Sequence, residues 1–205
     1  MLKLDGVHKK FKSALVAEQI SVDLGPCTYG LLGRNGSGKT TLLRCITRVE
    51  KVNGGRIVYT DGDGREVKDY LDHIGYLPQN FDVFPELTAY EVLQFFANLK
   101  GYKITEEEID HLLEILNLSP QRDMTVKTLS GGMKRRLGIA QALIGDPDVL
   151  LLDEPTSGLD DGNTEIIKNL IREYPADKIC ILSTHDSRLF DLTHEIMDFN
   201  LSVSL

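Results

Sequence analysis

A glycine-rich loop near the start of the chain has the composition needed to hold phosphate. Positions 33–40 read G-R-N-G-S-G-K-T and match the pattern G-x-x-x-x-G-K-[ST], between an apolar segment and one expected to be helical. Glycines let successive backbone N–H groups turn inward around an anion, and the N-terminus of the following helix favours the same negative charge. Lys39 would reach the β- and γ-phosphates, and the hydroxyl of Thr40 would bind Mg²⁺. The pattern predicts a nucleotide site formed by Gly33, Arg34, Asn35, Gly36, Ser37, Gly38, Lys39, Thr40 and Thr41.

Two adjacent carboxylates follow the apolar run at positions 149–152, which is typical of a buried parallel strand. Ligands of open α/β sheets bind beyond the carboxyl ends of the strands, where Asp153 and Glu154 would lie. Asp153 fits a carboxylate on the Mg²⁺ side of a nucleotide, and Glu154 fits a base for a water that attacks the γ-phosphate. Asp-Glu-Pro also suits a plain strand exit, but the phosphate loop favours the catalytic interpretation.

A second possible anion site precedes the acid pair by about twenty residues. Ser130, Gly131 and Gly132 stand at the start of an expected helix, whose N-terminal N–H groups would attract an anion. One chain has no evident use for two phosphate sites around one nucleotide, so the second would serve a nucleotide held by another copy. Taken alone, Ser-Gly-Gly is more often an ordinary helix cap.

These motifs, in this order and spacing, resemble those of the ATP-binding cassette (ABC) family of ATPases over nearly the whole chain. Residues 33–40 resemble its Walker A loop, residues 129–133 its signature loop, and residues 149–154 its Walker B strand with the catalytic glutamate. Gln79 is similar to the glutamine of the Q-loop, which in the family senses Mg²⁺ and the attacking water. The resemblance implies catalytic roles for Glu154, Gln79 and Lys39, and a Mg²⁺ site at Thr40, Gln79 and Asp153.

Three further positions match weaker family motifs. Asp160, in Ser-Gly-Leu-Asp, resembles the D-loop aspartate, and His185, in Ser-Thr-His-Asp, resembles the catalytic switch histidine. Phe11 stands where the family places an aromatic ring that stacks on adenine. Met133 departs from the family by replacing the usual glutamine of the signature loop. Because Ser130 and Gly132 would supply the phosphate contacts, we expect little loss of activity from this replacement.

The resemblance implies a head-to-tail pair of cassettes with two ATP molecules between them. Each ATP would lie between the Walker A loop of one copy and the signature loop of the other, where Ser130, Gly131 and Gly132 approach the γ-phosphate. ATP would close the pair and hydrolysis would open it. The pair would be a homodimer or would include a homologous cassette.

Separate transmembrane permease subunits are the partners that the resemblance implies, and export is the direction of the most similar cassettes. The chain would then lie in the cytoplasm, on the membrane surface through its partner. Two alternatives within the family are a soluble ATPase acting on a ribosome or an assembly complex, and a regulatory subunit with little turnover. A different P-loop enzyme, such as a small-molecule kinase, would leave Ser130 to Gly132 and His185 without a role.

The fold implied is α/β: a P-loop NTPase (RecA-like) core with an N-terminal antiparallel β subdomain and an inserted helical subdomain. Residues 1–205 form one domain, with the core and β subdomain at about 1–78 and 145–205 and the helical subdomain at about 80–144. The residues indicate strands at 20–24, 149–152 and 179–182, and a hairpin over 56–67. Residues 194–200 resemble the final core strand of the family. Helices are expected at 165–173, from Gly131 to before Asp146, and from a Thr105–Glu108 capping box to Pro120. We expect no C-terminal regulatory domain.

The aromatic residues between positions 80 and 101 have two equally weighted interpretations. They could line a groove for a helix of the membrane partner, or they could form the core of the helical subdomain. The residues concerned are Phe81, Phe84, Tyr90, Phe95 and Phe96.

Composition excludes several other classes of protein. The 205 residues are 41% hydrophobic and 26% charged, which suits a globular domain rather than a disordered chain. A net charge of −8 disfavours nucleic acid as a partner, so the basic run Lys134-Arg135-Arg136 is interpreted as a solvated helix face. The cysteines at 27, 45 and 180 are expected to be free, and no secretory leader or membrane span is expected. His8, His73, His111 and His194 are assigned no function.

Overall fold

The computed structural model describes residues 1–11, 14–34, 36–81 and 83–198. Among them, three antiparallel strands form a sheet in the order β2-β1-β4: β1 (Leu2–Phe11), β2 (Ala14–Leu24) and β4 (Gly54–Tyr59). Leu2 and Leu4 on β1 are buried together, because side chains two positions apart point to the same face of a strand. The predicted hairpin is present, although only its first arm, β4, is a regular strand. Its turn closes through Asp61, and its second arm pairs through a bridge between Thr60 and Glu66 and through the N–H of Val67, which donates to the backbone oxygen of Tyr59 at 2.9 Å.

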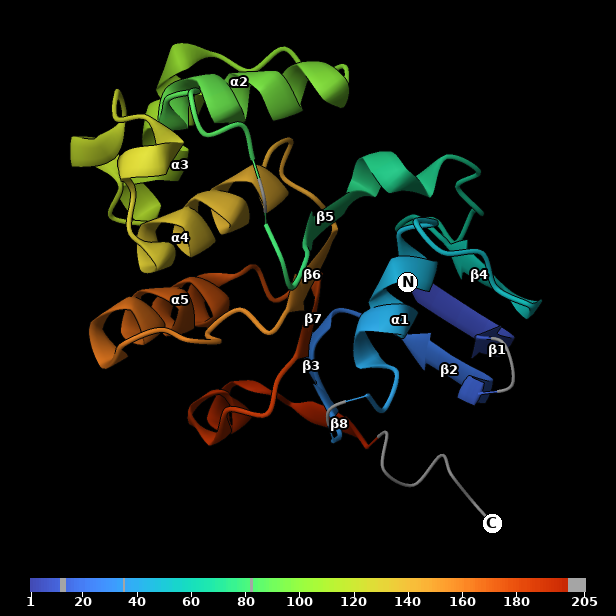
Figure 1. The fold of residues 1–205 in the computed structure, drawn as a ribbon. Helices are drawn as coiled ribbons and strands as arrows, with labels where there is room; N and C mark the ends of the chain where they lie inside the picture. The colour runs from blue at the N-terminus through green and yellow to red at the C-terminus, as the bar shows by residue number, and fades with distance from the viewer. Residues whose placement is uncertain (12–13, 35, 82, 199–205) are drawn as a thin grey trace.

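A parallel sheet forms the centre of the molecule (Figure 1). Within the described residues its strands run in the order β5-β6-β7-β3-β8. Their bounds are β3 (Cys27–Leu32), β5 (Ile74–Leu77), β6 (Val149–Asp153), β7 (Ile179–Ser183) and β8 (Glu195–Asp198). Every residue of β6 and β7 is buried, because alternate side chains enter cores on opposite faces of the sheet.

Helices cover both faces of this sheet. α1 (Lys39–Ile46) packs between the parallel sheet and the antiparallel sheet, and α5 (Asp161–Glu173) lies on the opposite face (Figure 1). The helical lobe, made of α2 (Ala89–Leu99), α3 (Glu106–Ile115) and α4 (Gly131–Ala142), lies beside α5. Short 3-10 turns span Tyr70–His73, Ser119–Gln121, Val126–Thr128 and Ser187–Leu192. The predicted P-loop fold class is confirmed.

Helices α2 and α3 each begin directly after a threonine that caps them. The Thr105–Glu108 capping box predicted at the start of α3 is present, and Thr88 with Glu91 forms another at the start of α2. The prediction that α3 extends to Pro120 is wrong. The helix ends at Ile115 because Asn117 adopts a left-handed backbone conformation, with φ of 51°.

A tight seam joins α4 to the edge strand β5. A Cβ atom added to Gly75 would lie 2.0 Å from the backbone oxygen of Ala142, and one added to Gly138 would lie 2.7 Å from Leu77 Cδ1. The helix and the strand therefore approach as closely as they do because both positions are glycine: at Gly75 backbone meets backbone, and at Gly138 the Leu77 side chain fills the space of the missing Cβ. One continuous apolar core runs through this seam, from Leu93 in the lobe to Leu182 in the sheet.

The basic run on α4 is not a solvated face, so that prediction is wrong. Arg135 is 8% exposed and Arg136 is 6% exposed. Both guanidinium groups are buried because backbone carbonyl oxygens of other segments accept their hydrogen bonds. The predicted free cysteines are confirmed, and burial raises the pKa of Cys180 to about 12. None of the helices in the described part of the chain has the length and apolarity to cross a membrane.

Candidate nucleotide site

The phosphate loop connects β3 to α1 at the carboxyl edge of the parallel sheet. Gly36 and Gly38 have φ of 81° and 104°, left-handed values that favour glycine. The Lys39 side chain is 6% exposed, and its Nζ donates to the backbone oxygen of Gly33 at 2.6 Å and to that of Arg34 at 3.3 Å. The ammonium group is therefore held inside the curve of the loop, where the sequence places a phosphate contact.

Residues from three separate segments line one cavity of about 300 Å³ beside this loop. The phosphate loop contributes residues 36–41, the segment after β5 contributes Gln79, and the end of β6 contributes Glu154. Parallel strands bring these segments together because their carboxyl ends meet at one edge of the sheet. The lining residues are Gly36, Ser37, Gly38, Lys39, Thr40, Thr41, Gln79 and Glu154.

Asp153 lies fully buried at the end of β6, next to the first turn of α1. Its Oδ1 accepts from Thr40 Oγ1 at 3.1 Å and from Ser183 Oγ. Its Oδ2 is buried and has no hydrogen-bond partner among the described residues. A hydroxyl beside an unpaired carboxylate oxygen is a donor set that suits Mg²⁺, a hard cation that prefers oxygen ligands.

Glu154 is held by its backbone as well as by its carboxylate. Its φ of 52° is left-handed, which is unusual for a residue with a side chain. Its N–H donates to the backbone oxygen of Ser183 at 3.0 Å and to Ser183 Oγ at 3.1 Å. Its Oε2 lies 2.9 Å from Nδ1 of His185, whose side chain is 61% exposed. Glu154 therefore links His185 to the cavity: Glu154 lines it, and His185, which does not, lies within hydrogen-bond distance of the Glu154 carboxylate. A carboxylate in this position can accept a proton from a bound water.

The residue after His185 fixes the course of this loop. Asp186 accepts hydrogen bonds from Arg188 and from Thr156 Oγ1, the latter at 2.8 Å. Chiefly through the bonds from Arg188, these contacts lower the pKa of Asp186 to about 2. The ionised carboxylate stabilises the folded chain above pH 4, the ordinary pKa of an aspartate, and this contribution disappears as the pH falls towards 2.

Replacing Asp186 with asparagine should therefore lower the free energy of unfolding at pH 7 by about 1 kcal/mol, because solvent screens the half-exposed Arg188. The difference from the parent should stay constant between pH 7 and 5 and shrink below pH 4. Urea unfolding at pH 7, 5, 3.5 and 2.5 measures it, with the exposed Asp191→Asn as control. A difference that does not change with pH would contradict this assignment.

The predicted signature residues form a second group away from the cavity. Ser130 caps α4 by accepting from Met133 N at 3.2 Å. A Cβ atom on Gly132 would lie 2.8 Å from the Asn163 side chain, whose amide donates to Asp160 at 2.8 Å. The signature loop therefore packs against the first turn of α5, which Asp160 caps. Neither Ser130 to Gly132 nor Asp160 lines the cavity at Lys39.

Two predicted residues cannot be placed. Asn35 and the side chain of Phe11 lie outside the described residues. Conversely, sequence analysis missed three residues that contact the predicted site residues: Ser183, Asn163 and Arg135. Ser183 belongs to the Ser-Thr-His-Asp motif, and Asn163 follows Asp160 at the spacing of a helix cap, so both had a local signal. Arg135 had none.

Comparisons with known proteins agree on one family. The family model described as "ABC transporter" matches residues 18–157. The Bacillus subtilis (strain 168) "Uncharacterized ABC transporter ATP-binding protein YdbJ" is 39% identical over 84% of this chain and 56% of its own. The Ralstonia nicotianae "Nod factor export ATP-binding protein I" is 34% identical over 90% of this chain and 59% of its own. The chain thus spans a little over half the length of these two relatives, and relatives named for import also match.

The fold of the chain is also similar to that of a solved ATP-binding cassette. The ATP-binding cassette MJ0796, in a dimeric post-hydrolysis state bound to ADP and Pi, superposes with a TM-score of 0.85 at 26% identity. The match covers 97% of this chain and 94% of that one. With the fold, the loops around the cavity and the matched family model in agreement, the chain belongs to the ABC transporter family of ATP-binding cassette ATPases.

Proposed function

We propose that this chain binds ATP with Mg²⁺, hydrolyses it in a head-to-tail pair of cassettes, and drives transport through separate membrane subunits. One observation carries the proposal. The phosphate loop, Gln79 and Glu154 line one cavity, whereas Ser130 to Gly132 lie with Asp160 in a second group that does not reach it. A second cassette, turned head-to-tail, supplies the missing signature loop.

The roles of the residues follow from their positions. Lys39 Nζ exchanges its bonds to the loop carbonyls for bonds to the phosphates. Glu154 takes a proton from the water whose oxygen bonds to the γ-phosphorus, while the bond from that phosphorus to the ADP oxygen breaks. His185 and Gln79 orient the water and the γ-phosphate. Thr40, Asp153 and Gln79 would hold Mg²⁺, which neutralises charge on the β- and γ-phosphates when bound.

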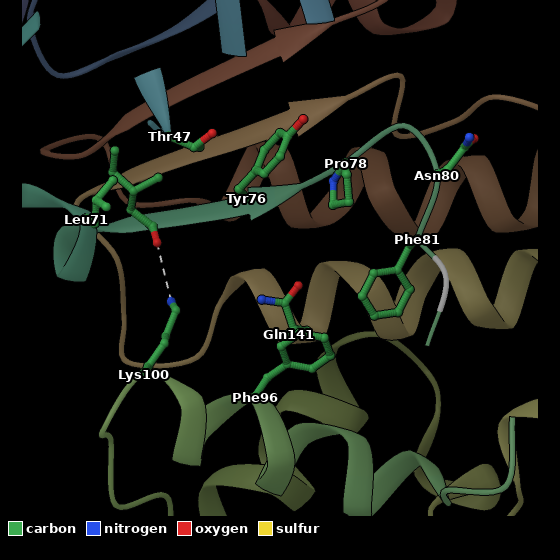
Figure 2. A pocket seen from close by; sticks show the side chains of 10 residues that line it. Thr47, Leu71, Tyr76, Pro78, Asn80, Phe81, Phe96, Lys100 and Gln141 are labelled. Carbon is green, nitrogen blue, oxygen red and sulfur yellow. Dashed lines mark hydrogen bonds between the residues drawn. The ribbon is translucent and has the colours of Figure 1, made fainter. Parts of the chain in front are cut away.

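A groove on the other side of the Gln79 segment is our candidate for the contact with the membrane subunit. It has a volume of about 380 Å³ and lies between β5 and the helical lobe. In Figure 2, Tyr76 and Pro78 line one side of the groove, and Phe96 and Gln141 line the other. The remaining lining residues are Thr47, Leu71, Ile74, Asn80, Phe81 and Lys100.

The aromatic residues of positions 80–101 contribute to the core of the lobe and to the lining of the groove. Phe81, Tyr90 and Phe96 pack partly buried against the core of the lobe, and two of them, Phe81 and Phe96, also line the groove. Phe84 is 58% exposed, and its ring packs edge-on against that of Phe95 at 5.3 Å. An apolar cleft of this kind suits one face of a helix from the membrane subunit. Export as the direction of transport rests on similarity to export cassettes alone.

Affinity purification of the tagged chain from detergent-solubilised native membranes tests the proposal. A polytopic membrane protein recovered in near-equal amount, with ATP hydrolysis by the complex, is the expected result. Recovery from the soluble fraction with ribosomal or assembly proteins would keep the ATPase and reject the transporter. Absence of ATP hydrolysis would favour a regulatory subunit.

The variant Leu71→Asp tests the groove. Leu71 lines it and is 38% exposed, so a charge there should leave the fold intact but oppose burial of an apolar helix. We expect recovery of the membrane protein to fall at least fivefold, with ATP binding unchanged. Ile115→Asp is the matched control, because Ile115 is 39% exposed and lies at the end of α3, outside the groove. Equal recovery of the membrane protein with both variants would show that the contact lies outside this groove.

A further inference from the structure

Arg135 is buried where the helical lobe meets the nucleotide site. It lies on α4, five positions after the signature serine Ser130, and it is 8% exposed. A guanidinium has five N–H donors in a rigid planar fork, and here backbone oxygens accept five hydrogen bonds from it. Nη1 donates to the backbone oxygens of Pro78 and Gln79, both at 2.8 Å. Nη2 donates to the backbone oxygens of Asp153 and, at 2.9 Å, Glu154. Nε donates to the backbone oxygen of Pro155 at 3.4 Å.

These acceptors belong to the two segments that carry the catalytic side chains. Pro78 and Gln79 begin the segment after β5, and Asp153 to Pro155 end β6. The hydrogen bonds go to main-chain oxygens, so Arg135 fixes the paths of the two backbones relative to each other and to α4. Burial lowers the pKa of Arg135, but an arginine remains protonated at any physiological pH, so all of its donors stay available.

The backbone of Glu154 needs such support. Its left-handed φ of 52° persists in a residue with a side chain only when the surroundings hold it. Ser183 accepts from its N–H, and Arg135 donates to its backbone oxygen, so the residue is held on both sides. If the bond from Arg135 is lost, the peptide after Glu154 can rotate, and the carboxylate moves with it.

We propose that Arg135 is a positioning residue that ties the signature helix α4 to Gln79 and Glu154, and thereby aligns the base with the attacking water. This inference rests on the proposed ATP hydrolysis. Arg135 does not reach the nucleotide cavity, so it acts through the two residues that do. A shift of α4, which begins with the signature loop, is passed by this guanidinium to both catalytic segments.

The test compares Arg135→Lys with Arg136→Lys. Lysine keeps the charge but offers three donors in place of five, so it cannot satisfy all five acceptors. Arg136, the next residue on α4, is also buried, and its Nη1 donates to the backbone oxygens of Leu116 and Asn117 inside the helical lobe. The two variants therefore make the same chemical change at adjacent buried positions, and one of them is away from the catalytic segments.

We expect Arg135→Lys to lower kcat for ATP hydrolysis about 100-fold, as displacement of a catalytic group by about 1 Å does, with KM for ATP within twofold of the parent. Arg136→Lys should lower the melting temperature but keep kcat within twofold. In a chain that already carries Glu154→Gln, adding Arg135→Lys should reduce the residual rate by far less than 100-fold, because the part of its effect that passes through Glu154 is already lost. Arg135→Gln, which retains two donors, is the second variant if Arg135→Lys does not fold.

Three results would overturn the inference while leaving the proposed function standing. They are a folded Arg135→Lys or Arg135→Gln protein with parental kcat, an equal loss of kcat in Arg136→Lys, or full multiplication of the two losses in the double variant. A parent chain that binds ATP and does not hydrolyse it, alone or with its membrane partner, would instead overturn the proposed function, and the inference with it.

Discussion

Replacing Glu154 with glutamine is expected to lower kcat for ATP hydrolysis by a factor of about 10² to 10⁴, the usual contribution of a general base. Glutamine has nearly the same shape as glutamate, and the backbone contacts of this position to Ser183 and Arg135 do not depend on the carboxylate. ATP should therefore still bind with near-parental affinity. Because hydrolysis would open the pair, the variant with ATP should accumulate as a dimer.

Two measurements check this prediction. Phosphate release at saturating ATP gives kcat, and size-exclusion chromatography with and without ATP gives the mass of the complex. Glu114→Gln, on the exposed surface of α3, is the control for a lost carboxylate. Parental turnover in Glu154→Gln would reject this residue as the base. A variant that binds ATP yet remains a monomer would contradict the pair for the isolated chain and leave only a pair held together by membrane subunits.

Replacing Lys39 with alanine should weaken ATP binding about 10- to 100-fold and bring turnover below detection. The ammonium is buried in the phosphate loop and is bonded to the backbone oxygens of Gly33 and Arg34, so phosphate would meet a charge already in place. Hydrogen bonds to charged groups contribute about 1.5 to 3 kcal/mol each, which gives the expected range.

Titration with a fluorescent ATP analogue measures the affinity, and Lys103→Ala, an exposed lysine outside the helices, is the control. Loss of folding would mimic loss of binding, so the melting temperature without nucleotide must stay near that of the parent. If Lys39→Ala bound ATP as tightly as the parent while remaining folded, the phosphates would have to lie elsewhere than in this loop.

The sequence predicts best those features whose signals are local. The phosphate loop, the acid pair after β6 and the capping box at Thr105 depend on neighbouring residues, so their types and spacing were enough. The end of α3 depends on the left-handed Asn117, a conformation that asparagine tolerates but does not require. The pattern therefore placed this boundary at the next proline instead.

Features that depend on distant segments were not predictable in the same way. α4 is buried on most of its surface, so it lacks the polar stripe that would have marked Arg135 as inward-facing. The acceptors of Arg135 stand 56 and 57 residues before it and 18 to 20 residues after it. A charged residue is expected at the surface unless its partners are known, and only the fold supplies those partners.

The glycine seam between α4 and β5 limits how the helical lobe can move. Where a helix backbone touches a strand, sliding or lifting by even one side-chain width would open a void or create a clash. Small rotation about the line of contact avoids both, because the atoms on the axis hardly move. The contacts at Gly75 and Gly138 lie one turn apart along α4, so such a rotation would keep α4 against β5, and the parts of the lobe farthest from α4 would move most.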